Sequence, residues 1–211
     1  MSDTKRILCF GDSNTWGFTP VTGERYPKDV RWTGILSKHP RWEVIEEGLS
    51  GRTTVFADVL KPWANGLDHI EPTVLSHEPL DVLVIMLGTN DMKLYVSNCP
   101  EASALGVVML AKKALNVAMY QKFKVLMVAP PIISDDRKKN GPPMRLINDS
   151  SLENSHEFSM LYREHAELNG FDFLDAGEFV QPSEKDGVHL TPEGHKALAA
   201  AIEAKLEEML K

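Results

Sequence analysis

The sequence has little cysteine, no long apolar run and no excess of positive charge. Its two cysteines, Cys9 and Cys99, form no metal-binding or redox motif. No apolar stretch is long enough to span a membrane, and the polar N-terminus has none of the features of a signal peptide. The formal net charge of -7 makes nucleic acid and anionic membranes poor partners. We therefore expect a cytoplasmic protein with reduced cysteines, no bound metal and no cofactor.

Two common sequence motifs are also missing. The chain contains no glycine-rich nucleotide loop and no Gly-x-Ser-x-Gly elbow, which is the signature of the common α/β-hydrolases. What is present is an ordinary globular composition, with 43% hydrophobic and 25% charged residues in a chain of 211. This length suits one domain with a full hydrophobic core, so residues 1–211 are expected to form a single domain.

Five apolar segments alternate with segments of helical character. The clearest of them, residues 81–87, is continuously apolar, as expected when helices cover both faces of a parallel sheet. The alternation predicts an α/β fold with a five-stranded parallel sheet. The predicted strands are residues 6–10, 41–47, 81–87, 125–129 and 171–175, and the predicted helices are 30–38, 67–76, 100–119, 156–168 and a final helix from residue 192.

Polar residues follow four of the predicted strands. Ser13 comes just after the first strand, Gly51 lies in a glycine-bracketed turn after the second, and Asn90 follows the third. Asp186 and His189 lie in the loop after the fifth strand. Because ligands bind beyond the carboxyl ends of the strands in such sheets, we expect these groups to meet at one edge of the sheet.

These residue types meet the requirements of a serine hydrolase. Ser13 can act as the nucleophile, His189 as the base that takes its proton, and Asp186 as the carboxylate that orients the imidazole. The backbone N–H groups of Ser13 and Gly51 and the side-chain amide of Asn90 can form an oxyanion hole.

Each short motif also has a structural interpretation. Gly-Asp-Ser and the later turns can be ordinary helix caps, hinges and strand ends. Asp186 and His189 can form only the start of a helix, or they can bind a metal together with Asp12 or Asp91, although no metal-ligand spacing is recognisable. His195, on the last helix, is expected to be structural or solvated rather than catalytic. A catalytically silent α/β binding module is the alternative outside the enzymes.

Taken together, the four motifs resemble the sequence blocks of the SGNH (GDSL-type) hydrolases. The resemblance spans nearly the whole chain and implies a flavodoxin-like three-layer α/β/α fold. It implies a triad of Ser13, Asp186 and His189, and an oxyanion hole of Ser13, Gly51 and Asn90. The blocks occur in order as Gly11-Asp12-Ser13, Gly51 within Gly48-Leu49-Ser50-Gly51-Arg52-Thr53-Thr54, Gly88-Thr89-Asn90-Asp91 and Asp186-Gly187-Val188-His189.

Longer stretches are similar to a bacterial arylesterase/acyltransferase subgroup. The similarity implies hydrolysis of small aryl or short-chain acyl esters, acyl transfer to alcohols or peroxide in some members, and a homo-oligomer. An O-deacetylase that acts on acetylated sugars is an alternative, because the same machinery serves both kinds of substrate. The matching stretches are Lys5-Arg6-Ile7-Leu8-Cys9-Phe10-Gly11-Asp12-Ser13, Arg31-Trp32-Thr33-Gly34, Glu46-Glu47-Gly48-Leu49-Ser50 and Met86-Leu87-Gly88-Thr89-Asn90-Asp91.

The loops beside these motifs carry aromatic residues, and rings at a pocket mouth exclude water and favour organic groups. Some of these rings can instead pack into the core or an interface. The polar segment 132–155 is too long for a plain connection, and we expect it to be a surface excursion that forms a lid or a subunit contact. The residues expected to contact the substrate are Asn14, Trp16, Phe56, Trp63 and Tyr95.

Overall fold

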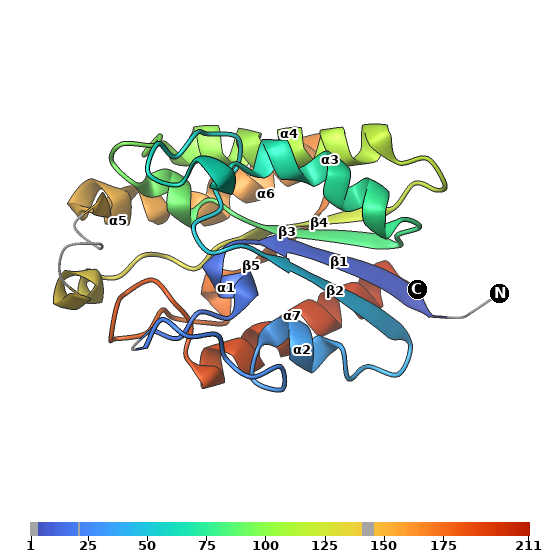
Figure 1. Ribbon diagram of the computed structural model, residues 1–211, viewed down its shortest axis with the longest axis horizontal. Helices are drawn as coiled ribbons and strands as arrows, with labels where there is room; N and C mark the ends of the chain where they lie inside the picture. The colour runs from blue at the N-terminus through green and yellow to red at the C-terminus, as the bar shows by residue number, and fades with distance from the viewer. Residues whose placement is uncertain (1–3, 21, 141–145) are drawn as a thin grey trace.

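The computed structural model describes residues 4–20, 22–140 and 146–211. Within them, parallel strands form one sheet in the order β2-β1-β3-β4-β5 (Figure 1). The predicted α/β fold and its five predicted strands are confirmed. The strands are β1 (Lys5–Gly11), β2 (Trp42–Gly48), β3 (Val82–Met86), β4 (Lys124–Ala129) and β5 (Asp172–Asp175).

Helices cover both faces of the sheet, which makes three layers (Figure 1). The helices α3, α4 and α6 pack on one face, and α2 and α7 pack on the other. The α-helices are α1 (Ser13–Trp16), α2 (Trp32–Leu36), α3 (Gly66–His77), α4 (Pro100–Val117), α5 (Asp149–Ser155), α6 (Phe158–Asn169) and α7 (Pro192–Met209).

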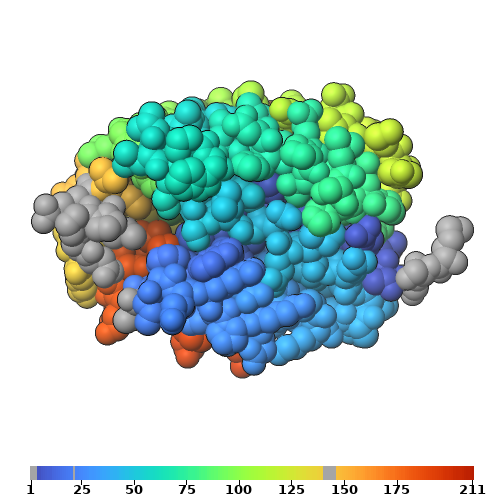
Figure 2. All heavy atoms as spheres, viewed as in Figure 1, coloured from blue at the N-terminus to red at the C-terminus, as the bar shows by residue number. Residues whose placement is uncertain are grey.

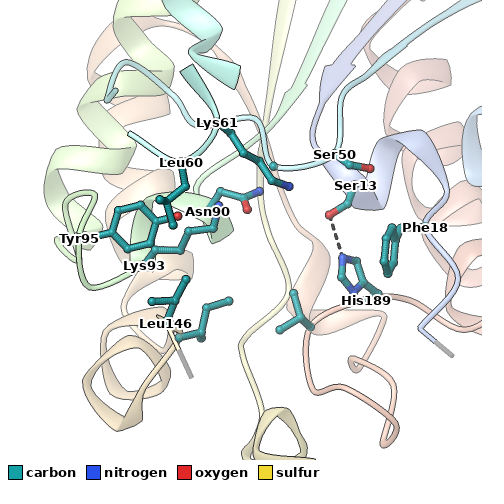
Figure 3. Close-up of a pocket in the computed structure, with 13 residues that line it drawn as sticks. Ser13, Phe18, Ser50, Leu60, Lys61, Asn90, Lys93, Tyr95, Leu146 and His189 are labelled. Atoms are coloured by element: carbon teal, nitrogen blue, oxygen red, sulfur yellow. Dashed lines mark hydrogen bonds between the residues drawn. The ribbon is translucent and has the colours of Figure 1, made fainter. Parts of the chain in front are cut away.

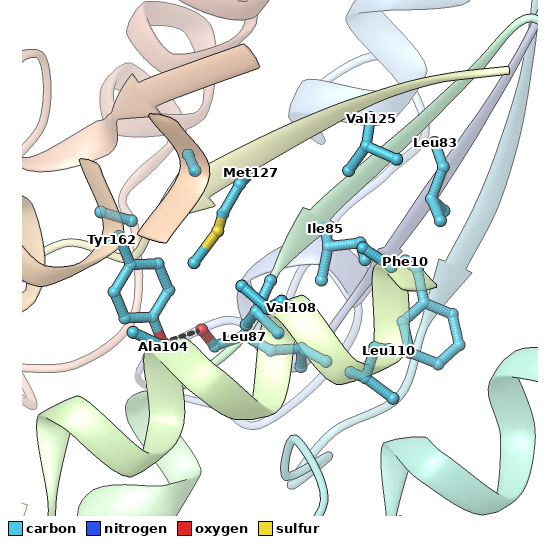
Figure 4. Close-up of a cluster of buried hydrophobic side chains, with 14 of the residues drawn as sticks. Phe10, Leu83, Ile85, Leu87, Ala104, Val108, Leu110, Val125, Met127 and Tyr162 are labelled. Carbon is cyan, nitrogen blue, oxygen red and sulfur yellow. Dashed lines mark hydrogen bonds between the residues drawn. The ribbon is translucent and has the colours of Figure 1, made fainter. Parts of the chain in front are cut away.

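Alternating strand residues supply the two hydrophobic cores. In β1, Leu8 and Phe10 face α3, α4 and α6, whereas Ile7 and Cys9 face α2 and α7. All four side chains are almost completely buried, and burying a side chain of the size of leucine stabilises the fold by roughly 1.5–3 kcal/mol. Figure 4 shows the first core, where β3 and β4 lie against α4. Because both faces of β1 are covered, the strand holds whatever follows its carboxyl end in a fixed position.

The topology brings the loops after β1 and β3 together. The chain runs from β1 to β2 on one side and then returns to place β3 on the other side of β1. This reversal is the point where ligands bind in open α/β sheets, just outside the carboxyl ends of the strands. Ser13 lies after β1 and Asn90 after β3, so the strand order alone makes them neighbours.

Figure 2 shows how loops and helices cover one face of the molecule. In the space-filling view, residues near α2 cover the lower part of the surface, and the segment that leads into α3 covers the upper part (Figure 2). None of the helices in the described parts of the chain has both the length and the apolar composition that a membrane span requires.

The segment 132–155 contains more regular structure than the sequence predicted. It includes a short 3₁₀ helix, η3 (Asp135–Asn140), and the helix α5. The side chain of Asn148 caps α5 by accepting a hydrogen bond from the N–H of Ser151 at 3.1 Å. Residues 141–145 of the predicted excursion lie outside the described residues.

Candidate active site

The turn after β1 presents Ser13 at the start of a helix. Asp12 is the N-cap of α1, and its carboxylate accepts a hydrogen bond from the N–H of Asn14 at 2.9 Å. This contact fixes the turn, so that Ser13 begins α1 with its hydroxyl at the edge of the sheet. Burial raises the pKa of Asp12, while the hydrogen bond from Asn14 and the nearby charges of His189 and Arg52 act in the opposite direction.

The loop before α7 brings a histidine and a carboxylate to this serine. His189 Nε2 lies 2.9 Å from Ser13 Oγ (Figure 3). His189 Nδ1 lies 2.6 Å from Asp186 Oδ2. Asp186 also accepts hydrogen bonds from the backbone N–H groups of Val188 and His189. Burial raises the pKa of Asp186, but the hydrogen bonds and charge of His189 outweigh it and hold this pKa below its ordinary value. Asp186 is therefore an ionised partner for the imidazole.

Asn14 ties the nucleophile helix to the histidine loop. Its amide donates a hydrogen bond to the carbonyl of Val188 at 3.2 Å and accepts one from the N–H of Leu190 at 3.0 Å. These two residues flank His189, so Asn14 sets the distance between the imidazole and Ser13. The sequence placed Asn14 in contact with substrate. The structure instead buries its side chain, with 2% exposed, and both ends of its amide are occupied.

Gly51 and Asn90 line the same cavity as Ser13 and His189. Gly51 has φ of 94°, a left-handed conformation that favours glycine. Asn90 donates one amide hydrogen to Asp12 Oδ2 at 3.3 Å. An amide has two such hydrogens, which leaves the second for an acceptor in the cavity.

A buried aspartate holds the two loops that carry Gly51 and Asn90. Asp91 accepts hydrogen bonds from the N–H of Thr54 at 2.9 Å and from its hydroxyl at 2.5 Å. Burial raises the pKa of Asp91 to about 6, although the hydrogen bonds from Thr54 oppose the shift. The loop after β2 is therefore fastened to the loop after β3 close to the cavity.

Arg52 contacts the carboxyl ends of β1 and β2 at the same edge of the sheet. Its guanidinium donates hydrogen bonds to the carbonyls of Gly11 and Glu47 and stacks 3.9 Å from the centre of the Phe10 ring. Burial lowers the pKa of Arg52 to about 10. Arg52 lies within the second of the predicted sequence blocks, and its residue type alone indicates no role. Only the tertiary structure shows that it joins the ends of β1 and β2.

These groups surround a cavity of about 300 Å³. The ring of Phe18 stacks on the imidazole of His189, with centroids 4.2 Å apart, and forms one wall (Figure 3). The wall opposite Ser13 and His189 comes from loops. The cavity is lined by Ser13, Phe18, Ser50, Gly51, Leu60, Lys61, Asn90, Lys93, Tyr95, Leu146, Ile147, Val188 and His189.

The sequence matches the GDSL-like lipase/acylhydrolase family over residues 9–197. The chain belongs to this family. A solved structure of an aryl esterase from M. smegmatis is 38% identical, with a TM-score of 0.92, and the match covers 97% of this chain and 99% of that one. A carbohydrate acetylesterase from Sinorhizobium meliloti is 35% identical, with a TM-score of 0.92 over 98% of this chain and 100% of that one. A comparison with curated proteins finds no match.

The protein is therefore an SGNH-type serine esterase with the fold of the GDSL-like family. Among the described residues, no group of three or more His, Cys, Asp or Glu side chains could hold a metal ion. Asp12 and Asp91, considered above as metal ligands, are instead engaged in hydrogen bonds to backbone and side chains. His195 is fully buried, so it is not one of the solvated histidines.

The expected substrate contacts of this esterase are placed differently from the prediction. Of the five predicted residues, Tyr95 lines the cavity, whereas Trp16, Phe56 and Trp63 do not. Trp63 is 61% exposed, and Trp16 lies under the guanidinium of Arg25. The lining residues that the motifs did not indicate include Leu60, Lys61, Lys93, Leu146 and Ile147, which all lie outside the recognised sequence blocks.

Proposed function

We propose that this esterase hydrolyses small aryl and short-chain acyl esters through an acyl-serine intermediate. The observation that carries the proposal is the hydrogen-bonded chain Ser13–His189–Asp186, which opens onto a cavity also lined by Gly51 and Asn90. A nucleophile, a base and a carboxylate in this order are what acyl transfer to serine requires.

In the proposed reaction, Ser13 Oγ attacks the ester carbonyl as His189 Nε2 takes its proton. Asp186 keeps the imidazole in place and stabilises the imidazolium that forms. The oxyanion accepts hydrogen bonds from the N–H groups of Ser13 and Gly51 and from the amide of Asn90. His189 then protonates the leaving alcohol, and water attacks the acyl-serine by the same steps.

The direct test is the hydrolysis of 4-nitrophenyl acetate by the wild-type protein and by Ser13→Ala. We expect the substitution to lower kcat by roughly 10⁴-fold or more, because the nucleophile is lost while the fold is kept. Circular dichroism and thermal unfolding of both proteins provide the control. Wild-type turnover that survives in Ser13→Ala would contradict the role of Ser13.

A second proposed activity is acyl transfer to an alcohol in water. Apolar side chains line much of the cavity, among them Phe18, Leu60, Ile147 and Val188. Apolar walls favour an organic alcohol over water near the acyl-serine. Supplying vinyl acetate and benzyl alcohol in buffer and measuring benzyl acetate against free acetate tests this activity. Acetate without any ester product would remove acyl transfer and leave hydrolysis in place.

O-deacetylation of sugars is the alternative substrate class, and the similarity to a carbohydrate acetylesterase supports it. The apolar lining of the cavity favours the aryl and short-chain esters. A panel that contains phenyl acetate and acetylated xylose or glucose separates the two. A higher kcat/KM for the acetylated sugars would reverse this preference.

We further propose that residues 1–211 act as one domain in a cytoplasmic homo-oligomer. Large apolar side chains are exposed near the cavity, including Val59, Leu60 and Trp63, and such side chains are often covered by a neighbouring subunit. The free thiol of Cys99 is exposed, which suits a reducing compartment. The segment 132–155 is the predicted subunit contact. Light scattering at micromolar concentration tests the assembly, and a monomeric mass would contradict it.

A further inference from the structure

The cavity carries positive charge in a negatively charged protein. The chain has a formal net charge of -7, yet two lysines, Lys61 and Lys93, line the cavity. No Asp or Glu is among the described residues that line it. The two lysines differ in whether a carboxylate of the protein neutralises their charge.

Lys93 is neutralised by the protein itself. Its ammonium lies 2.9 Å from Asp58 Oδ2, and the hydroxyl of Tyr95 donates to the same oxygen at 3.1 Å. Asp58 is buried, and it also accepts hydrogen bonds from the backbone N–H groups of Leu60 and Lys61. The carboxylate of Asp58 is therefore fully engaged and is turned toward Lys93.

Lys61 has no such partner within the described part of the chain. Its ammonium makes no hydrogen bond and no ion pair with those residues, although the side chain is only partly exposed. A Cβ added at Gly51 would lie 2.8 Å from Lys61 Nζ, so the ammonium sits against the glycine of the proposed oxyanion hole. Figure 3 shows Lys61 reaching toward the space between Asn90 and Ser13.

The surroundings of Lys61 favour the arrival of an anion. Burial and the charge of Lys93 lower the pKa of Lys61, and the charge of Asp58 opposes this shift only in part. A half-buried ammonium beside a second cation gains more from a bound carboxylate than a solvated lysine does.

We propose that Lys61 binds a carboxylate group of the substrate, so that the preferred esters are acidic. The inference rests on the proposed esterase function and names the substrate class of the same site. Because Lys61 Nζ lies against Gly51, the carboxylate must stand a few atoms from the scissile carbonyl. It can belong to the acyl part or to the alcohol part of the ester, and the two arms of the test separate these sources.

The test compares acidic esters with neutral counterparts of the same shape. For the alcohol part the pair is 4-acetoxybenzoate and 4-acetoxybenzamide. For the acyl part it is phenyl hydrogen glutarate and the phenyl ester of glutaramic acid, both corrected for spontaneous hydrolysis. The quantity measured is the ratio of kcat/KM for the acidic ester to that for the neutral ester. Since each ratio is taken within one variant, a general loss of activity cancels.

We expect Lys61→Met to lower this ratio roughly ten- to hundredfold for the ester pair whose carboxylate reaches Lys61. Lys61→Arg keeps the charge and is expected to retain most of the ratio. Lys112→Met removes the same charge from an exposed position on α4, away from the cavity, and serves as the matched control for net charge. It is expected to leave the ratio unchanged.

A ratio that Lys61→Met leaves unchanged in both arms would overturn the proposal. An equal loss on acidic and neutral esters would also overturn it, because Lys61 would then support the oxyanion or the loop rather than a carboxylate. If the wild-type protein cleaves neither member of either pair, the proposed esterase function itself fails. The two failures are thus distinguishable.

Discussion

The two sides of the cavity are built in different ways. On the triad side, formed by Ser13, Asp186, His189 and Asn14, every side chain is buried and each is held by hydrogen bonds. On the loop side, formed by Leu60, Lys61, Lys93 and Tyr95, the side chains are more exposed, and Leu60 is 60% exposed. The reacting geometry is thus held by several contacts at once, whereas the contacts to substrate depend on loops. Substrate preference can therefore change on the loop side without disturbing the chemistry.

The largest effect outside the triad is expected at Asn90. Asn90→Ala removes an oxyanion donor, and we expect kcat to fall roughly 10²- to 10³-fold with a smaller change in KM. Steady-state kinetics with 4-nitrophenyl acetate measure both values. If only KM changed, Asn90 would be a substrate contact and would belong with the loop side.

The pH dependence of stability shows whether the imidazole of His195 is excluded from water. Burial, followed by the charges of Arg31 and His189, lowers the pKa of His195 to about 4 from its ordinary value of 6.5. Because the folded-state pKa is depressed, the stability contributed by neutral His195 is complete above pH 6.5 and is lost as the pH falls toward 4. At pH 5 the loss is about 2 kcal/mol.

Urea unfolding at pH 7.5 and pH 5.0 measures this loss. We expect the wild-type protein to lose about 2 kcal/mol more than His195→Gln, which cannot titrate in this range. His156→Gln, at an exposed position, is the matched control and should follow the wild type. If the wild type and His195→Gln lost the same free energy of unfolding, the pKa of His195 would not be lowered in the folded protein.

A substitution at Asn14 shows whether the hydrogen bonds of this side chain hold His189 in position. Asn14→Ala leaves the carbonyl of Val188 and the N–H of Leu190 without partners, and such a loss costs about 1–3 kcal/mol. We expect kcat to fall about tenfold, because His189 is no longer held at its distance from Ser13, while KM stays within a factor of about two. A rise in KM with unchanged kcat would support the original prediction that Asn14 contacts substrate.

The smallest effect is expected on the loop side. Tyr95→Phe removes one hydrogen bond to Asp58 and leaves the Lys93–Asp58 ion pair in place. We expect KM to rise about two- to threefold with little change in kcat, since a single hydrogen bond contributes about 0.5–1.5 kcal/mol. Trp63→Ala, which lies outside the cavity, is the control. A large drop in kcat for Tyr95→Phe would mean that the two sides are coupled.

The sequence predicted the elements whose signal is local. The strand at 81–87 was recognisable from its apolar run, and it is β3 in the structure. Ser13, Asp186 and His189 could be proposed together because each follows a predicted strand, and parallel strands end at the same edge of the sheet. Their separate motifs were too short to decide between catalysis and an ordinary turn.

The loop side could not be predicted because its path depends on tertiary contacts. Asp58 carries no motif, yet its buried carboxylate orders the chain at Leu60 and Lys61 and binds Lys93 from a different loop. The same reason explains Trp63, an aromatic residue near a motif, which is exposed and does not line the cavity. An aromatic residue in a loop indicates apolar surface, but its direction is decided by the fold.

Mass spectrometry can show whether Ser13 is the residue that forms the acyl-enzyme. Ser50 is a demanding internal comparison, because this serine also lines the cavity and its buried hydroxyl has no hydrogen-bond partner among the described residues. The protein is treated with a fluorophosphonate, digested and mapped, with Ser13→Ala and Ser50→Ala treated in parallel. We expect one adduct per chain, on Ser13, present in Ser50→Ala and absent from Ser13→Ala. An adduct on Ser50, or labelling that persists in Ser13→Ala, would contradict it.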